Sequence, residues 1–161
     1  MATVHLIHGF VGAGKTTYAR RLERELGAVR FTHDEWMVRL YGPAPPEERF
    51  AEYADRVTEL IWKVTDRLIE LDRDVILDFG FWTRASRDEA RARARVAGAE
   101  VRLYHVQCPE EVMRQRTLAR SRHLPEGALW INEAAFEEFK ERFEPLEEDE
   151  ECFGTVTQQT D

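Results

Sequence analysis

The feature that most constrains this chain is the run GFVGAGKT at residues 9–16, which has the spacing G-x-x-x-x-G-K-[ST]. Glycines in this pattern let the backbone turn its N–H groups inward around a phosphate, and a following helix adds its positive end. A short β-prone run at 3–7 precedes the pattern, and helical periodicity over about 14–26 follows it. The sequence therefore predicts a phosphate-binding loop (P-loop) between a strand and a helix.

The motif gives individual residues of this loop an expected role. Lys15 is expected to reach the β- and γ-phosphates of a nucleotide, and the Thr16 hydroxyl is expected to bind magnesium. Only three of the 23 basic residues are lysines, which makes a lysine at this place more informative. The expected cofactors are Mg²⁺ and ATP, with GTP left open. The residues expected to bind the nucleotide are Gly9, Val11, Gly12, Ala13, Gly14, Lys15, Thr16 and Thr17.

Strand-like and helix-like segments alternate along the rest of the chain. Short apolar runs at 28–31, 75–77, 101–106 and 153–156 are typical of strands, and apolar residues spaced by three and four over 47–72 predict a long amphipathic helix. This alternation predicts an α/β fold of three layers, with a mainly five-stranded parallel sheet flanked by helices and a helical lid. With 161 residues, 43% of them hydrophobic, we expect a single domain, 1–161.

Composition limits the partners and the compartment. A formal net charge of -8 argues against a general duplex-binding surface, although a long nucleic acid is not excluded. No run approaches the roughly 18 apolar residues of a membrane span, and no signal peptide is recognisable, so we expect a soluble cytoplasmic protein. Cys108 and Cys152 match neither redox nor zinc spacing and are expected to be free thiols. The acidic run 147–151 is interpreted as a solvated connection. The oligomeric state stays open.

The early P-loop, together with Asp34 just after the second predicted strand, resembles the AAA_33-like small P-loop kinases. These include polynucleotide kinase, the zeta toxins, gluconate and shikimate kinases, and chloramphenicol phosphotransferase. The resemblance spans nearly the whole chain and implies transfer of the γ-phosphate to a hydroxyl group. In several of these relatives an Asp after the second strand accepts the proton of the attacking hydroxyl, and Asp34 occupies the matching place. The alternative is that Asp34 only caps the following helix.

A second acidic residue and a group of arginines complete the predicted catalytic side. Asp78 closes the strand at 75–77 and should emerge beside the P-loop, where it would hold magnesium, grip the substrate or stabilise the next loop. The resemblance implies a mobile lid at about 114–130. Its arginines Arg120 and Arg122 would close onto the β- and γ-phosphates, and Arg116 would lie against the adenine ring. Solvated helix arginines are the alternative.

Aromatic residues and arginines follow both acidic residues and predict an acceptor pocket for a ring or a planar group. Core packing is the competing explanation for Phe79 and Phe81. His33 is the histidine that could tune Asp34, whereas the others are expected to be structural or solvent-facing. The expected substrate-side residues are Asp34, Trp36, Arg39, Asp78, Phe81, Trp82 and Arg84.

Several functions fit these motifs. We favour a kinase that phosphorylates a small molecule. A 5′-hydroxyl polynucleotide kinase ranks second, because those enzymes place an Arg three residues after the catalytic Asp, where this chain has Met37. A toxin that phosphorylates a nucleotide sugar would use similar chemistry. The alternative from another class is an ATPase switch, whose nucleotide state would control a partner.

Overall fold

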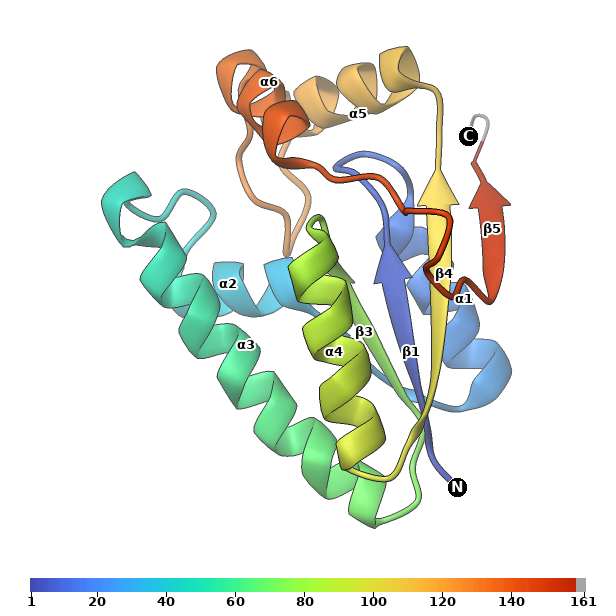
Figure 1. Cartoon of the computed structure of the whole chain (residues 1–161). Coiled ribbons are helices and arrows are strands. Elements are labelled where there is room, and N and C mark those ends of the chain that lie inside the picture. Colours follow the sequence, from blue (N-terminus) through green and yellow to red (C-terminus); the bar gives the residue numbers. More distant parts are fainter. Residues whose placement is uncertain (159–161) are drawn as a thin grey trace.

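The computed structural model describes residues 1–158 of the chain and contains one sheet of five parallel strands (Figure 1). Their spatial order is β2-β3-β1-β4-β5, so β1 is central. The predicted α/β fold with a five-stranded parallel sheet is confirmed. The strands are β1 (Thr3–His8), β2 (Val29–Thr32), β3 (Val75–Gly80), β4 (Glu100–Gln107) and β5 (Gly154–Thr157).

Helices cover both faces of this sheet and its carboxyl edge (Figure 1). One face is covered by α1, the opposite face by α3 and α4, and the carboxyl edge by α5 and α6. No helix within residues 1–158 is long and apolar enough to cross a membrane. The helices are α1 (Lys15–Leu26), α2 (His33–Tyr41), α3 (Glu47–Glu70), α4 (Arg84–Val96), α5 (Glu110–Arg122) and α6 (Glu133–Arg142).

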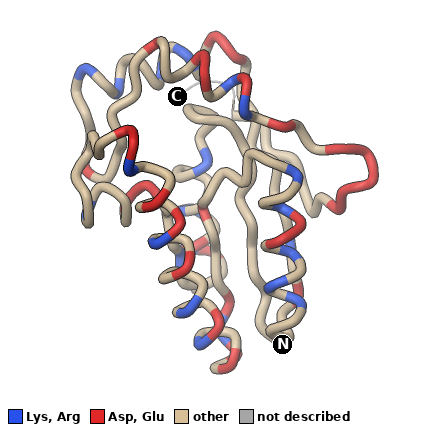
Figure 2. Tube along the Cα trace, turned by 60° about the vertical axis from the view of Figure 1, so that its left-hand side comes forward, with Lys and Arg blue, Asp and Glu red and all other residues tan. Residues whose placement is uncertain are grey.

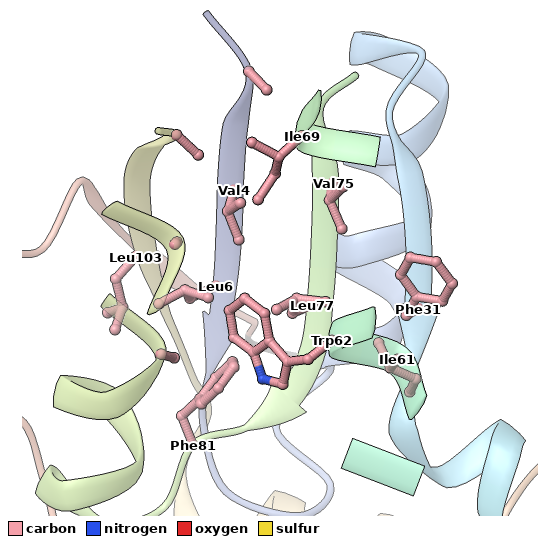
Figure 3. Packing of buried hydrophobic residues seen from close by; sticks show 14 of the residues in the cluster. Val4, Leu6, Phe31, Ile61, Trp62, Ile69, Val75, Leu77, Phe81 and Leu103 are labelled. Carbon is pink, nitrogen blue, oxygen red and sulfur yellow. The ribbon is translucent and has the colours of Figure 1, made fainter. Parts of the chain in front are cut away.

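The core explains why β1 lies at the centre. All six of its residues are buried, as expected for a parallel strand covered on both faces. Successive side chains of a strand point to opposite faces, so Leu6 packs with α3 and α4 while Ile7 packs with α1. Figure 3 shows Trp62 of α3 lying over Leu77 of β3. This packing fixes the carboxyl ends of β1, β2 and β3 side by side, which is where the candidate site forms.

The acidic run 147–151 was predicted to be a solvated connection. That holds for Glu147, Glu148, Asp149 and Glu151, which are exposed, but not for Glu150. Figure 2 shows the run as an unbroken red loop. The Glu150 side chain is fully buried and accepts hydrogen bonds from Arg87 Nε at 2.7 Å and Arg91 Nη1 at 2.9 Å. Burial alone would raise the pKa of Glu150, but hydrogen bonds from Arg87, the Glu147 backbone and Arg91 lower it to about 2. The run therefore clamps the segment after α6 onto α4.

The sequence carried a signal for this clamp. Arg84, Arg87, Arg91 and Arg95 follow one another at spacings of three or four, so they share one face of α4. Each of them forms an ion pair with a residue of the run 147–151. A stripe of cations on a helix predicts an acidic partner segment, and the run was the only such segment of the required length.

Stability should depend on pH through His8, which is fully buried at the end of β1. Its Nδ1 donates to the carbonyls of Gly80 and Phe81, both at 3.0 Å, and its Nε2 has no hydrogen-bond partner within residues 1–158. Burial first, and then the charge of Arg87, lower its pKa from 6.5 to about 4. The folded state therefore resists protonation that the unfolded chain accepts.

The pKa of His8 is lower in the folded protein than in the unfolded chain. The stability that the neutral His8 ring provides is therefore fully present above about pH 6.5 and is lost as the pH falls towards 4. We expect this residue to lower the free energy of unfolding by about 2 to 3 kcal/mol between pH 7 and about pH 4.5. Urea titrations of the wild type and His8→Gln should show a shallower pH dependence in the variant. His123→Gln, at an exposed site, should keep the wild-type slope; equal slopes in all three proteins would refute this role.

Candidate active site

The P-loop follows β1, and its geometry requires glycine at three positions, Gly9, Gly12 and Gly14. Gly12 and Gly14 have φ angles of 79° and 95°, in the left-handed region that favours glycine. A Cβ atom on Gly9 would lie 2.4 Å from the Val106 carbonyl oxygen, and one on Gly12 would lie 2.6 Å from that of Met113. The loop is therefore enclosed by β4 and α5, which hold it in a fixed shape.

Side chains at the start of α1 point into the site that this loop encloses. Lys15 Nζ donates to the Phe10 carbonyl oxygen at 2.9 Å, and Thr16 Oγ1 donates to Asp78 Oδ2 at 2.7 Å. The Val11 and Ala13 side chains of the loop are buried. Thr17, the remaining residue expected to bind the nucleotide, is exposed at the next position of α1.

Asp78 lies within β3, which was expected to close at this residue but continues past it to Gly80, and it is almost fully buried, with 4% of its surface exposed. Burial raises its pKa, whereas the charge of Lys15 and hydrogen bonds from Thr16 and Thr32 oppose that rise. Burial also disfavours the charged form of Lys15 and so lowers its pKa, whereas the charges of Asp78 and Asp34 oppose this change. The hydroxyl and carboxylate oxygens of Thr16 and Asp78 are hard donors of the kind that Mg²⁺ prefers, so these residues fit the ion.

Thr32 is a site residue that the sequence analysis missed. It ends β2, and its Oγ1 donates to the same Asp78 Oδ2 at 2.9 Å, so two hydroxyl groups orient one carboxylate oxygen. Nothing in the sequence marks it except its place directly before α2. Only the pairing of β2 with β3, in which Thr32 lies opposite Asp78, brings them together.

Replacing Thr32 with Val should weaken magnesium use. The change removes one hydroxyl that positions Asp78 and leaves a side chain of similar size, and losses of positioning groups behind a metal ligand cost about 10- to 100-fold. We expect the Mg²⁺ concentration for half-maximal nucleotide binding to rise by about tenfold. Thr155→Val, an exposed threonine on β5, serves as the control and should leave it unchanged. Equal magnesium dependence in both variants would contradict this role of Thr32.

Asp34 does not cap α2, so that alternative is wrong. The helix begins at His33 with Thr32 as the capping position, and Asp34 lies exposed in the first turn. Its charge acts on two cations, because it raises the pKa of both Lys15 and Arg120 against the lowering effect of their burial. Asp34 therefore lies close to the P-loop lysine and to the end of α5, with an unobstructed carboxylate.

His33, the histidine whose position could have let it tune Asp34, has its side chain turned towards α3. Its Nε2 lies 3.2 Å from the Ala54 carbonyl oxygen, to which it donates, and 3.0 Å from Thr58 Oγ1. Burial lowers the pKa of His33 in spite of the opposing charge of Asp34. The two adjacent side chains thus act on different sides of α2, and His33 contributes a neutral ring.

The segment between α5 and α6, part of the expected lid, runs from α5 down towards α2 and back to α6 (Figure 1). The Trp130 amide donates to the Pro43 carbonyl oxygen at 2.9 Å, and a Cβ on Gly127 would lie 3.0 Å from the Glu35 side chain. Ser121 Oγ accepts from the Ile131 amide at 2.9 Å and so joins the two ends of the segment. The lid therefore rests on α2 and on the turn that follows it.

The predicted lid arginines differ in their positions. Arg120 is exposed in the last turn of α5 but lies near Asp34 and Arg116. Desolvation lowers its pKa first, the charge of Asp34 raises it and that of Arg116 lowers it. Arg116 is half-buried, with Nη1 3.8 Å from Cys108 Sγ. Arg122 is exposed in the last turn of α5, and no contact described within residues 1–158 joins it to the P-loop. The structure thus brings Arg120, but not Arg122, to the acidic residues.

The residues after Asp78 contact the P-loop and the core, and they also line the cavity described below. The Trp82 indole N–H donates to the Gly9 carbonyl oxygen at 3.2 Å, and its ring packs on Phe10 with 5.5 Å between centroids. Phe81 is buried in the core, with an unusual φ of 48°. Core packing, the competing explanation for Phe81, is therefore correct in part.

Three other predicted substrate residues make their described contacts elsewhere than at Asp34 and Asp78. Trp36 packs against the Phe31 ring at 5.8 Å, and Arg39 is exposed in the last turn of α2. The Arg84 guanidinium pairs with Asp88 and with three carboxylates of the run 147–151. We therefore leave Arg84 out of the acceptor site proposed below.

A cavity of about 550 Å³ opens between α3 and α4, and His33 of α2 is one of its lining residues. Its floor includes Phe79 and Phe81 from the end of β3, and Trp62 comes from α3 (Figure 3 shows Trp62 beside Phe81). Trp82 also lines it. The sequence therefore identified part of this lining. It missed Asp55, Glu59 and Glu89, which also line the cavity but are solvent-exposed helix residues.

Comparisons with known proteins agree with this geometry. A family model described as an AAA domain (AAA_33) matches residues 4–146, whereas no curated protein matches the chain. A protein of Chloroflexus aurantiacus, provisionally named a kinase, superposes with a TM-score of 0.77 at 15% identity, covering 96% of this chain and 87% of that one. Kti12 of Chaetomium thermophilum, solved with ADP-AlF3, gives 0.68 at 18% identity, with 95% and 88% covered.

A gluconokinase of Sinorhizobium meliloti 1021 gives a TM-score of 0.63 at 16% identity, covering 98% of this chain and 83% of that one. Identities this low show a shared fold, while the family match extends over most of the chain. The protein therefore belongs to the AAA domain family (AAA_33) and has the fold of the small P-loop kinases.

Proposed function

We propose that this protein is an ATP-dependent phosphotransferase that moves the γ-phosphate onto a hydroxyl group of a small molecule. The observation that carries the proposal is the meeting of Lys15, Asp34, Asp78 and Arg120 at one edge of the sheet, next to a cavity. Phosphoryl transfer needs positioning and charge compensation more than covalent chemistry, and this set supplies both.

In the proposed reaction the acceptor oxygen attacks the γ-phosphorus. A new P–O bond forms while the bond to the bridging oxygen breaks, ADP leaves, and the hydroxyl proton passes to Asp34. Lys15 compensates charge on the β- and γ-phosphates, and Arg120 adds a second cation from the lid. Arg122 would join it only if the lid moved. Magnesium, held by Thr16 and Asp78, would neutralise charge on the phosphate oxygens.

Two observations favour a small acceptor over the polynucleotide alternative. The cavity of about 550 Å³ falls within the range of small-molecule sites, roughly 300 to 1,000 Å³. The charge of the whole chain is -8, which disfavours a long polyanion. The nucleotide would be ATP on this proposal, with Arg116 beside the base.

The test is a transfer screen with γ-labelled ATP and magnesium. The panel contains sugars, nucleosides, amino alcohols, aminoglycosides and 5′-hydroxyl oligonucleotides. We expect label on one class of small hydroxyl compound, and a rate about 10² to 10³ lower in Lys15→Met, because a preorganised cation is removed from the transferred phosphate. Lys63→Met, an exposed lysine on α3, should keep the wild-type rate.

Label that appears only as free phosphate with every acceptor would overturn this proposal. An ATPase switch would then be the better reading, provided that Lys15→Met also abolishes hydrolysis. Label on oligonucleotides alone would favour the 5′-hydroxyl kinase instead.

A further inference from the structure

Two hydrogen bonds in series connect Asp78 with Arg30, an arginine of β2 that the proposed reaction does not use. Thr32 Oγ1 donates to Asp78 Oδ2 at 2.9 Å, and Arg30 Nη1 donates to the same Thr32 oxygen. Arg30 and Thr32 are two residues apart on β2, so their side chains share one face of the sheet. Strand pairing places Asp78 beside Thr32. Arg30 is therefore connected to the carboxylate through a single hydroxyl group.

The chemistry of the three groups gives this connection a direction. A guanidinium group only donates hydrogen bonds, so Arg30 occupies a lone pair of the Thr32 hydroxyl. A hydroxyl group has one proton to donate, and Asp78 Oδ2 accepts it. Without Arg30 the hydroxyl would be free to rotate and to donate elsewhere. Arg30 therefore makes Thr32 a donor to Asp78.

Ion pairs on neighbouring elements hold the Arg30 guanidinium in this position. Its Nε donates to Glu23 Oε2 on α1 at 3.0 Å, and its Nη1 also donates to Glu35 Oε1 on α2 at 3.2 Å. Only 14% of the Arg30 side chain is exposed. The guanidinium thus has acceptors on α1, β2 and α2, which restrict its movement away from Thr32.

The hydrogen bonds to Asp78 make its two carboxylate oxygens different. Oδ2 accepts from both Thr16 and Thr32, whereas no hydrogen bond described within residues 1–158 reaches Oδ1. A carboxylate that is held through one oxygen presents the other to a cation, and groups that orient a metal ligand in this way affect metal affinity. The orientation of Asp78 therefore depends on the direction in which the Thr32 hydroxyl points.

We propose that Arg30 is a positioning residue for magnesium, because it fixes the Thr32 hydroxyl as a donor to Asp78 and so prepares this carboxylate for the ion. The inference rests on the proposed function, which assigns Mg²⁺ to Thr16 and Asp78. On this basis Arg30 acts on the use of magnesium and not on the binding of the nucleotide alone. It acts only while residue 32 carries a hydroxyl group.

The experiment measures the Mg²⁺ concentration for half-maximal binding of a fluorescent ATP analogue, with no acceptor present. Arg30→Met should raise this concentration by about fivefold, the contribution of one hydrogen bond, and should leave the affinity for the analogue in EDTA unchanged. The control, Arg20→Met, removes an equal charge that pairs with the same Glu35 oxygen but has no bond to Thr32. It should change neither quantity.

A double-mutant cycle separates this role from a structural one. In the Thr32→Val background, Arg30→Met should change the half-saturating Mg²⁺ concentration by less than about twofold, because no hydroxyl group is left to orient. In the Thr32→Ser background, which keeps the hydroxyl group, the effect of about fivefold should return. An arginine that only ties α1 and α2 to β2 would have the same effect in every background.

Urea unfolding without nucleotide checks that each variant is folded. Glu23 and Glu35 are partly exposed, so water can solvate them in Arg30→Met and the fold should survive. If Arg30→Met does not fold, Arg30→Lys takes its place, since it keeps a charge beside both glutamates but lacks the planar fork that serves Thr32 at the same time. The direction of its effect and the dependence on the hydroxyl group should be the same.

The inference fails in three cases: Mg²⁺ dependence within about twofold of wild type in Arg30→Met, an equal effect in the Thr32→Val background, or an equal effect in Arg20→Met. The transfer screen tests the proposed function separately. If the Mg²⁺ titrations give the expected order but no hydroxyl compound receives label from ATP, the role of Arg30 stands and the kinase proposal fails. If label is transferred but Arg30→Met leaves the Mg²⁺ dependence intact, the kinase proposal stands and this inference fails.

Discussion

Asp34→Asn should lower the rate of phosphate transfer by about 10² to 10⁴, the usual contribution of a general base. Asparagine has nearly the same shape, but its side chain cannot accept the hydroxyl proton. The side chain is exposed and acts on Lys15 and Arg120 through its charge rather than through a cap, so the fold should survive. Initial rates with the best acceptor from the screen, together with nucleotide dissociation constants, measure the effect.

The control for this variant is Glu47→Gln. Both changes remove a carboxylate from the first turn of a helix, where it interacts favourably with the helix dipole, so both should cost a similar small amount of stability. Only Asp34→Asn should slow the transfer. A rate within about twofold of wild type would mean that another group takes the proton or that the hydroxyl needs no base.

Arg87→Met should lower the free energy of unfolding by about 3 to 5 kcal/mol, because it leaves a buried carboxylate without its main partner. Arg87 is fully buried and donates five hydrogen bonds. Two go to Glu150, and the others go to the carbonyl oxygens of Phe81, Glu144 and Pro145. These bonds join the loop after β3 to the chain after α6. Urea unfolding at neutral pH measures the loss.

Two further variants make this test decisive. Arg95→Met removes an exposed pair with Glu151 on the same helix and should cost at most about 1 kcal/mol. Arg87→Met combined with Glu150→Met should recover much of the loss, because the uncompensated charge is gone. If Arg87→Met is no more destabilising than Arg95→Met, the clamp contributes little to stability.

The P-loop and the order of the elements could be predicted from local sequence. The spacing of Gly9, Gly14 and Lys15 needs particular residue types, because only glycine tolerates the φ angle of Gly14 and the close approach of the Val106 carbonyl to Gly9. Apolar periodicity gave α3 its length, and the apolar run at 75–77 located β3, although that strand continues past Asp78 to Gly80. These are properties of consecutive residues, so the chain itself displays them.

The acidic run shows where such prediction fails. Five consecutive carboxylates are usually solvated, and nothing in the run marks Glu150 as buried. Its partners lie about 60 residues away on α4, so the ion pairs exist only after the fold has brought the two segments together. Arg84 shows the same limit, since all its ion-pair partners except Asp88 are residues of that run.

The sequence by itself determined that this protein has a P-loop on an α/β sheet, since that motif depends on backbone geometry that a few glycines and a lysine specify locally. Only the tertiary structure decided how the site is completed. Strand pairing put Thr32 against Asp78, and the placement of α5 over the carboxyl edge of the sheet brought Arg120 to Asp34. The packing of α3 beside α4 created the cavity between them. These are contacts between residues far apart in the chain, and local pattern cannot specify them because each depends on how whole elements pack.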